Sequence, residues 1–256
     1  ATSNQLMREL FSNRRKLLET LLEVENKQRQ LVPFILNPIQ LDMLTTSTGR
    51  DVYVKPAQVG ATTLWCADFL TDCITINGTI AVIISYDDFS AQRLLLKAKK
   101  FHTTLQQRIP SIPKLNHKSS TELSFYVPGG NWYSAFYIFS AKGYVLGRGE
   151  AIHNLLLDEY AFYPEGTHAE IAASVIKRVP LIKGTKIIIQ STPNGADNAF
   201  HDLYNESKDR VAIEKIIFAP HFYTWDLHPE YSMQMDSDFC LTGDDVYPLE
   251  NLSSEE

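Results

Sequence analysis

Apolar residues along the chain are spaced so that strands and helices alternate. Residues 51–55 and 79–85 form short and nearly continuous apolar runs, which are typical of strands buried on both faces. The same reasoning predicts strands at 151–159, 184–191 and 211–218, and helices at 61–76, 88–107, 164–178 and 198–208. This alternation predicts an α/β domain with a mainly parallel sheet and helices on both faces.

The two ends and one central segment depart from the alternation. Leucines recur at helical spacing between residues 3 and 30, which predicts a leading helix that is partly detached from the core. Residues 121–127 and 132–140 flank a Pro-Gly-Gly-Asn turn and predict a hairpin. The pattern fades from about residue 219 into an acidic tail. We therefore divide the chain into an N-terminal helical extension (1–32), a nucleotide-binding core (33–220) and a C-terminal lid or linker (221–256).

Composition narrows the classes of function. The 256 residues carry a formal net charge of −6, whereas domains that coat nucleic acid by charge alone are usually basic. Any contact with DNA must therefore be local or must use other parts of an assembly. Cys66, Cys73 and Cys240 match no metal spacing and indicate thiols in a reducing compartment. The sequence shows neither a signal peptide nor a run of 18 apolar residues, so we expect a soluble, cytoplasmic protein.

The stretch Val54–Thr63, VKPAQVGATT, resembles a phosphate-binding loop whose lysine has moved. The usual loop reads G-x-x-x-x-G-K-[ST]. Gly60 and Thr62 occupy the positions of its second glycine and its hydroxyl, but Ala61 replaces the lysine and Lys55 replaces the first glycine. Backbone N–H groups from Val59 to Thr63, at a helix N-terminus, would face phosphate. Lys55 would reach the β/γ-phosphates from the other end. An ordinary strand–turn–helix with a surface lysine is the alternative.

Polar residues also follow two other predicted strands. Asp158 ends the run NLLLD, where a carboxylate can hold the water shell of Mg²⁺ together with the Thr62 hydroxyl. Glu159 follows directly and is placed to act as a general base on water. The run 186–190 leads into Ser191-Thr192-Pro193-Asn194-Gly195, whose polar groups would sense the γ-phosphate. Carboxylates that merely end a strand, and a plain turn, remain the alternatives.

Gln40, in LNPIQLDML, is a candidate adenine reader, because a carboxamide can pair with both N6 and N7 of adenine. A surface glutamine on a short helix is the alternative. In an open parallel sheet, ligands bind at the carboxyl ends of the strands, so we expect these elements to meet there.

In order along the chain, NPIQ, KPAQVGATT, LLLDE and STPNG resemble the N-terminal ATPase domain of the large terminase subunit of tailed bacteriophages, over roughly residues 33–218. The resemblance implies a P-loop NTPase fold of the ASCE type and a motor that translocates double-stranded DNA into a procapsid. ATP and Mg²⁺ would be its cofactors. It also implies a variant Walker A loop with its lysine at the start, at Lys55. The nucleotide-contacting residues would be Gln40, Lys55, Gln58, Val59, Gly60, Ala61, Thr62 and Thr63.

The resemblance assigns the remaining roles residue by residue. Thr62 and Asp158 would serve the metal, and Glu159 would be the catalytic carboxylate. Hydrolysis would be coupled to movement by Ser191, Thr192, Asn194 and Gly195. Arg148, ten residues before Asp158 and flanked by glycines, is the candidate arginine finger that enters a neighbour's site. Lys142 and Arg178 are rivals for that role, and Arg50 is a candidate for action in cis.

Partners and location follow from the same resemblance. A terminase assembles as a ring on the capsid portal, works with a small subunit, and acts in the host cytoplasm. A nuclease domain would follow this one, and because the chain stops at Glu256 we expect no nuclease activity from these residues. The DNA-gripping surface is poorly marked. Arg93, Lys97 and Lys100 share one predicted helical face, which is more often simply solvated.

Two other classes of protein remain open. A superfamily 2 helicase-like or restriction-type ATPase also uses a glutamine motif and an Asp-Glu pair. It normally keeps the lysine at the end of the loop and needs a second domain, and neither feature is seen here. A non-catalytic nucleotide-binding module is the other class. Glu159 argues against it, because a binder needs no base beside the metal carboxylate.

Overall fold

A twisted eight-stranded sheet forms the centre of the molecule. The computed structural model describes residues 10, 12–142, 150–213 and 215–231. The strand order is β10-β3-β9-β8-β4-β7-β6-β5. The strands are β3 (Arg50–Val54), β4 (Ile80–Ser85), β5 (Lys114–Lys118), β6 (Glu122–Tyr126), β7 (Ser134–Ser140), β8 (Asn154–Asp158), β9 (Lys186–Ser191) and β10 (Ala219–Phe222). From β10 to β7 all neighbours are parallel, whereas β6 and β5 are antiparallel additions.

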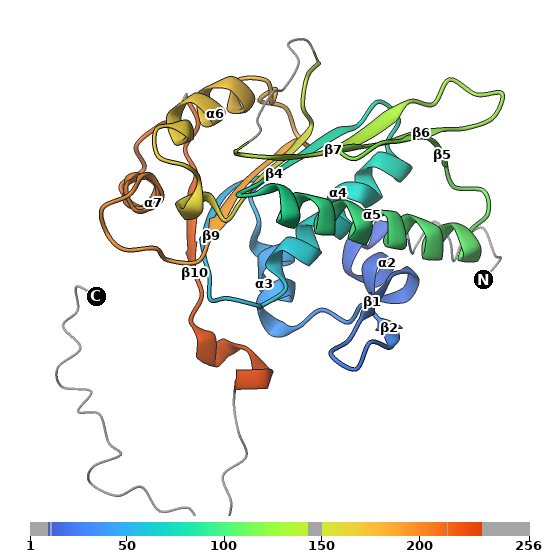
Figure 1. Cartoon of the computed structure of the whole chain (residues 1–256), viewed down its shortest axis with the longest axis horizontal. Helices are drawn as coiled ribbons and strands as arrows, with labels where there is room; N and C mark the ends of the chain where they lie inside the picture. The colour runs from blue at the N-terminus through green and yellow to red at the C-terminus, as the bar shows by residue number, and fades with distance from the viewer. Residues whose placement is uncertain (1–9, 11, 143–149, 214, 232–256) are drawn as a thin grey trace, which may run out of the picture.

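Helices cover both faces of this sheet (Figure 1). One face carries α2 (Arg14–Leu21), α3 (Pro38–Thr46), α4 (Ala61–Thr75) and α5 (Asp88–Arg108), and the other carries α6 (Thr167–Ile176) and α7 (Ala199–Lys208). Five of the strands, β3, β9, β8, β4 and β7, each supply side chains to the apolar cores on both faces of the sheet. In β9, Ile188 packs against the α4 side while Ile187 and Ile189 face the α6 and α7 side. This period of two explains why the strands read as continuous apolar runs.

The expected fold class is therefore confirmed, and most expected elements lie within two residues of their predicted bounds. The hairpin at 121–140 is present as β6 and β7. Several helices start after a capping side chain: at the start of α5, the Asp87 side chain accepts a hydrogen bond from the Ser90 backbone N–H. The parallel order places the carboxyl ends of β3, β9 and β8 side by side at one edge of the sheet.

The prediction of one long N-terminal helix was wrong over residues 22–30. Helix α2 ends at Leu21, and β1 (Glu23–Glu25) pairs antiparallel with β2 (Leu31–Pro33). The Asn26 side chain accepts a hydrogen bond from the Gln30 backbone N–H, which closes the turn and competes with continued helix. The expected detachment of the leading helix is not seen in α2, because Leu17, Leu18 and Leu21 are buried in the core shared with α4.

Two strands also differ from the sequence prediction. The strand expected at 211–218 is replaced by β10 at Ala219–Phe222, and residues 213 and 216 form only an isolated bridge. As an edge strand of alternating half-buried and exposed residues, β10 lacks a strong apolar signal. Strand β5 is mostly polar and was not predicted. After β10, the short 3₁₀ helices η2 (Trp225–Leu227) and η3 (Pro229–Tyr231) extend the fold.

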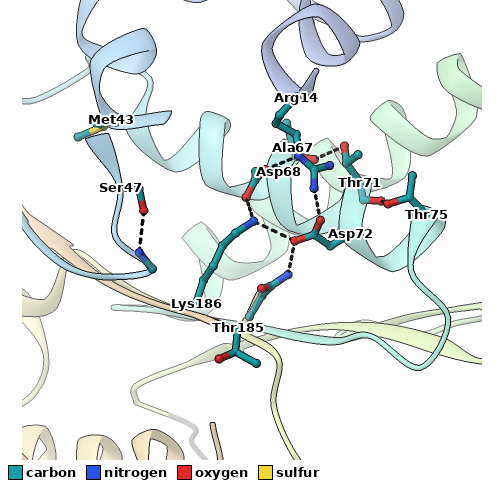
Figure 2. Close-up of polar contacts among 12 residues, drawn as sticks. Arg14, Met43, Ser47, Ala67, Asp68, Thr71, Asp72, Thr75, Thr185 and Lys186 are labelled. Carbon is teal, nitrogen blue, oxygen red and sulfur yellow. Dashed lines mark hydrogen bonds and ion pairs between the residues drawn. The ribbon is translucent and has the colours of Figure 1, made fainter. Parts of the chain in front are cut away.

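A buried ionic cluster joins α2, α4 and the start of β9 (Figure 2). Asp68 and Asp72 lie four residues apart on α4, and both side chains are almost fully buried. The Lys186 ammonium lies 2.5 Å from Asp68 Oδ2 and 2.9 Å from Asp72 Oδ2, and the Arg14 guanidinium pairs with both carboxylates from the other side. Two buried like charges at this helical spacing would repel, and the two cations offset that repulsion.

Candidate functional site

The loop between β3 and α4 is held in a conformation that requires glycine at its end. Gly60 has a φ of 77°, and a Cβ added there would lie 2.5 Å from the Gln40 side-chain nitrogen. Gln58 also has a positive φ, of 58°. Helix α4 then begins at Ala61 with no acidic residue in its first turn. Its first N–H groups and the positive end of its dipole therefore remain available for an anion.

Lys55 lies at the start of this loop and is buried, with 4% of its surface exposed. Its backbone N–H donates to the Ser191 carbonyl at 3.1 Å, which ties the end of β3 to the end of β9. Its ammonium lies 2.7 Å from Glu159 Oε1. The lysine displaced in sequence is thus brought against the residue that follows β8.

Thr62, Asp158 and Gln190 form a second group directly beside the first. The Thr62 hydroxyl donates to Asp158 Oδ1 at 2.9 Å. The Gln190 amide nitrogen donates to the same carboxylate oxygen at 2.7 Å and to the Thr62 hydroxyl at 3.1 Å. Gln190 was missed by sequence reasoning, although it precedes Ser191 at the end of the same strand and is fully buried.

Glu159 leaves the strand in a left-handed backbone conformation, with φ 53° and ψ 46°. This conformation is uncommon for a residue with a side chain and recurs at functional sites. Its Oε2 accepts hydrogen bonds from the Thr192 backbone N–H at 3.2 Å, from the Thr192 hydroxyl at 3.3 Å and from the Ser191 hydroxyl at 3.4 Å. The turn after β9 therefore orients the carboxylate that follows β8.

The electrostatics of the site favour an added cation. Burial raises the pKa of Asp158, and the neighbouring Glu159 carboxylate raises it further, although Lys55, Gln190 and Thr62 act in the opposite direction. A carboxylate and a hydroxyl are hard oxygen donors of the kind that Mg²⁺ prefers. No cluster of three histidine, cysteine or acidic residues suited to a metal occurs within the described part of the chain. Thr62 and Asp158 therefore suit a Mg²⁺ ion that keeps most of its water and phosphate ligands.

Gln40 is buried beneath the loop rather than presented to a ligand. Its side-chain oxygen accepts from the Asn37 backbone N–H at 3.1 Å, and its nitrogen donates to the Gly60 carbonyl at 2.9 Å. Asn37 in turn caps α3 and donates to the Val59 carbonyl at 3.0 Å. In this structure Gln40 supports the backbone of the loop, and its role as an adenine reader stays a prediction.

Three other residues predicted from the sequence, Asn194, Gly195 and Arg50, lie outside the group formed by Lys55, Thr62, Asp158 and Glu159. Asn194 donates to the Ala161 carbonyl at 3.1 Å, and Gly195 is an exposed turn residue with φ 79°. Arg50 begins β3 and binds backbone carbonyls of Gly49, Thr185 and Pro180, at the end of the strand opposite the loop. This position does not suit the role in cis that the sequence suggested.

The candidates for an arginine finger are separated. Arg178 donates to the Glu150 carbonyl, and its own carbonyl accepts from the Ile152 backbone N–H just before β8. It therefore lies near the amino end of the sheet. Lys142 is exposed just after β7. Arg148 lies outside the described residues, as does Cys240.

A cleft of about 950 Å³ opens beside these groups. Its lining includes Gln58, Thr62, Asp158, Glu159 and Thr192, which come from the three strand ends and the loop. Sequence reasoning did not assign several other lining residues to this site: Tyr86 and Phe162 were not singled out, and Arg93 and Lys97 were considered only for contact with DNA. A helix that packs beside the loop supplies two of them, and no local motif signals that packing.

The segment after β10 also contacts the loop. The Tyr231 hydroxyl donates to the Ala57 carbonyl at 2.8 Å, and a ring nitrogen of the buried His228 lies 3.2 Å from the Asn37 side-chain nitrogen. The sequence pattern fades here because these contacts use isolated polar atoms rather than an apolar repeat.

Comparison with known proteins places this geometry in a family. The family described as "Terminase large subunit, T4likevirus-type, N-terminal" matches residues 52–242, which is most of the chain. The chain belongs to this terminase family. The resemblance inferred from the four sequence motifs is thereby confirmed. A search of curated protein sequences finds no match.

Solved terminases share the fold. The ATPase domain of the large terminase from Thermus phage P74-26 is 20% identical, with a TM-score of 0.59 over 75% of this chain and 82% of that one. The large terminase of bacteriophage HK97 is 15% identical, with a TM-score of 0.64 over 83% of this chain and 43% of that one. A terminase from another thermophilic bacteriophage, solved with ATP-gamma-S, is 19% identical, with a TM-score of 0.53 over 77% and 47%.

Some of the solved terminases are much longer than this chain. It spans less than half the length of the HK97 terminase and of the terminase solved with ATP-gamma-S. The P-loop type of fold expected from the sequence is confirmed by the shared architecture. Among the described residues, no helix is both long and apolar enough to cross a membrane.

Proposed function

We propose that this terminase domain hydrolyses ATP with the help of Mg²⁺ and that hydrolysis drives double-stranded DNA into a procapsid. The observation that carries the proposal is the meeting of Lys55, Thr62, Asp158 and Glu159 at one edge of the sheet, beside a cleft. A cation, a hydroxyl and two carboxylates, grouped at the first turn of α4, match the needs of phosphoryl transfer to water. The relative solved with ATP-gamma-S supports the choice of nucleotide.

The loop and α4 would bind the phosphates. The N–H groups at the start of α4 point away from the helix body, and Gly60 lets the backbone approach a ligand closely. Lys55 would place its ammonium on a phosphate oxygen. In this structure, the Lys55 ammonium is paired with the Glu159 carboxylate. A phosphate that draws the ammonium away leaves the Glu159 carboxylate free to accept a proton.

Glu159 would act as the general base. Three donors from Ser191 and Thr192 hold its Oε2, so the carboxylate is oriented before water is bound. Thr62 and Asp158 would hold Mg²⁺, which supplies positive charge to the phosphate oxygens when it is bound. Gln190 fixes the Asp158 carboxylate by donating to it at 2.7 Å. Because the turn after β9 contacts the base, it is suited to transmit a change at the phosphate to the rest of the domain.

Replacing Lys55 with methionine is expected to weaken ATP binding. A hydrogen bond to a charged group contributes roughly 1.5–3 kcal/mol, so the Kd should rise about 10- to 150-fold. Titration with a fluorescent ATP analogue and Mg²⁺ measures this change. Lys114, exposed in β5 at the far edge of the sheet, provides a matched Lys→Met control. Equal affinity in the Lys55 and Lys114 variants would contradict the assignment of the displaced lysine.

The motor would assemble as a ring on the portal, with a terminase small subunit, in the infected host cell. Family membership supports this part of the proposal. In such a ring, Arg148 would enter the site of a neighbouring subunit. Specific ATPase activity is then expected to rise with protein concentration and to fall when Arg148→Ala is mixed into wild-type protein. Specific activity that stays constant down to dilute monomer would contradict action in trans.

A further inference from the structure

Lys97, on the middle of α5, reaches across to the first turn of α4. Its ammonium donates to the Thr63 hydroxyl at 2.6 Å. Thr63 directly follows Thr62 in that first turn. Lys97 also lines the cleft that contains Thr62, Asp158 and Glu159. The long helix after β4 therefore contributes a cation to the proposed nucleotide site.

Two neighbouring lysines of α5 behave differently. Lys100 pairs with Glu25 at 2.7 Å, and Lys99 donates to the Ser119 carbonyl on the β5 side. In the described part of the chain, Lys97 forms no ion pair, and its one hydrogen bond is to a neutral hydroxyl. Burial lowers the pKa of Lys97, although the Asp158 charge acts to raise it. Its ammonium is therefore partly removed from water while its hydrogen-bond partner is neutral.

The Lys97 ammonium lies at the N-terminus of α4, which by itself is an unfavourable place for a positive charge. The N-terminus of a helix carries a partial positive charge, which repels cations and attracts anions. Helix α4 has 15 residues and no acidic residue in its first turn. The Asp158 charge favours a lysine held there but does not offset its burial, so an anion beside it would add the missing stabilisation. The arrangement is thus explained by a ligand and not by helix stability.

The charges around the cleft show which ligand would fit. Among the acidic lining residues, Glu25 is paired with Lys100 and Glu159 with Lys55, so Asp158 alone has no cationic partner. Arg93, one turn before Lys97 on α5, is exposed and also lines the cleft. It stacks over the Phe89 ring at 5.6 Å, which leaves its guanidinium edges accessible. Two cations on one wall therefore suit an anionic ligand.

We propose that Lys97 binds the phosphate chain of the nucleotide from within the same subunit, opposite Lys55, with Arg93 as an outer contact. This inference rests on the proposed nucleotide site and adds to it a residue outside every motif. Lys55 approaches from the start of the loop, whereas Lys97 approaches from α5. The phosphates would then lie between two ammonium groups from opposite sides of the α4 N-terminus.

The test compares Lys97→Met, Lys97→Arg and the control Lys99→Met in the full chain. Methionine keeps the length of the side chain but removes its charge. Affinity for ATP, ADP and inorganic tripolyphosphate is measured with Mg²⁺, and the melting temperature is measured without ligand. We expect Lys97→Met to weaken ATP and tripolyphosphate binding roughly tenfold or more. Lys97→Arg should recover most of that loss, and Lys99→Met should match wild type.

Each outcome separates the two proposals. If wild-type protein binds ATP and Lys97→Met binds it equally well, the role of Lys97 is overturned while the nucleotide site stands. If Lys97→Met weakens binding only in proportion to a lowered melting temperature, or if arginine fails to rescue, the lysine is structural and the inference is overturned. If wild-type protein binds neither ATP nor tripolyphosphate, the proposed function itself fails, and this inference fails with it.

Discussion

Replacing Glu159 with glutamine is expected to slow ATP hydrolysis by roughly 10²- to 10⁴-fold, while ATP binding persists. Glutamine keeps the shape of the side chain and can still contact Ser191 and Thr192, but it cannot accept the proton of the attacking water. Loss of the ion pair with Lys55 should leave that ammonium free for phosphate, so affinity for ATP should be equal or higher. Single-turnover hydrolysis and analogue titration measure the two effects separately.

Glu165 provides the control for this substitution. It is exposed in the loop that follows η1 (Tyr160–Phe162), so Glu165→Gln removes the same charge without touching the cleft. Hydrolysis by Glu159→Gln at the wild-type rate would rule out the general-base role. Loss of ATP binding in that variant would show instead that Glu159 serves to build the site.

The central strands could be predicted because each carries its own signal. Buried strands such as β4 and β9 are short apolar runs rich in isoleucine, and their length and composition distinguish them from a buried helix such as α4. The rule that ligands bind at the carboxyl ends of such strands then brought Lys55, Asp158 and Glu159 together on sequence grounds. The ion pair between Lys55 and Glu159 agrees with that expectation.

The residues that were missed depend on how elements pack. Helical periodicity put Arg93, Lys97 and Lys100 on one face but gave no information about which neighbour that face meets. The packing of α5 on α4 and β1 decides it, so Lys97 reaches Thr63 and Lys100 reaches Glu25. Gln190 was missed because a glutamine inside an apolar run carries no motif. For Gln40, a usable signal was present: Asn37 followed by Gln40 is the spacing of a capping box.

Helix α4 links the proposed site at its first turn to the ionic cluster around Asp68 and Asp72. Its first turn holds Thr62 and Thr63, and its second and third turns hold Asp68 and Asp72. The cluster fixes this helix against α2 and β9 through Arg14 and Lys186 (Figure 2). Asp68 and Asp72 are four residues apart in the sequence, but Arg14 and Lys186 come from distant parts of the chain. Their pairing therefore follows from the topology and carries no local sequence signal.

Replacing Lys186 with methionine is therefore expected to destabilise the fold by about 3–5 kcal/mol, because it leaves Asp68 and Asp72 buried with Arg14 alone. Urea unfolding measures the change, and Lys183→Met, exposed three residues earlier, is the control. Burial by itself raises the pKa of Asp68, but Lys186 and Arg14 lower it more, so the net shift is downward. An aspartate whose pKa is lowered in the folded state stabilises the fold at pH values above its unfolded pKa of about 4. That stabilisation is lost as the pH falls through the pKa of the folded state.

The substitution should therefore also move acid unfolding to higher pH, since the Asp68 carboxylate loses the nearer of its two cations. Adding Asp68→Asn to Lys186→Met should recover part of the lost stability, because the unpaired charge is then removed. A loss below about 0.5 kcal/mol, as is usual for exposed ion pairs, would mean that water screens the cluster. In that case the anchoring of α4 would rest on its apolar contacts with Leu17, Leu18 and the sheet.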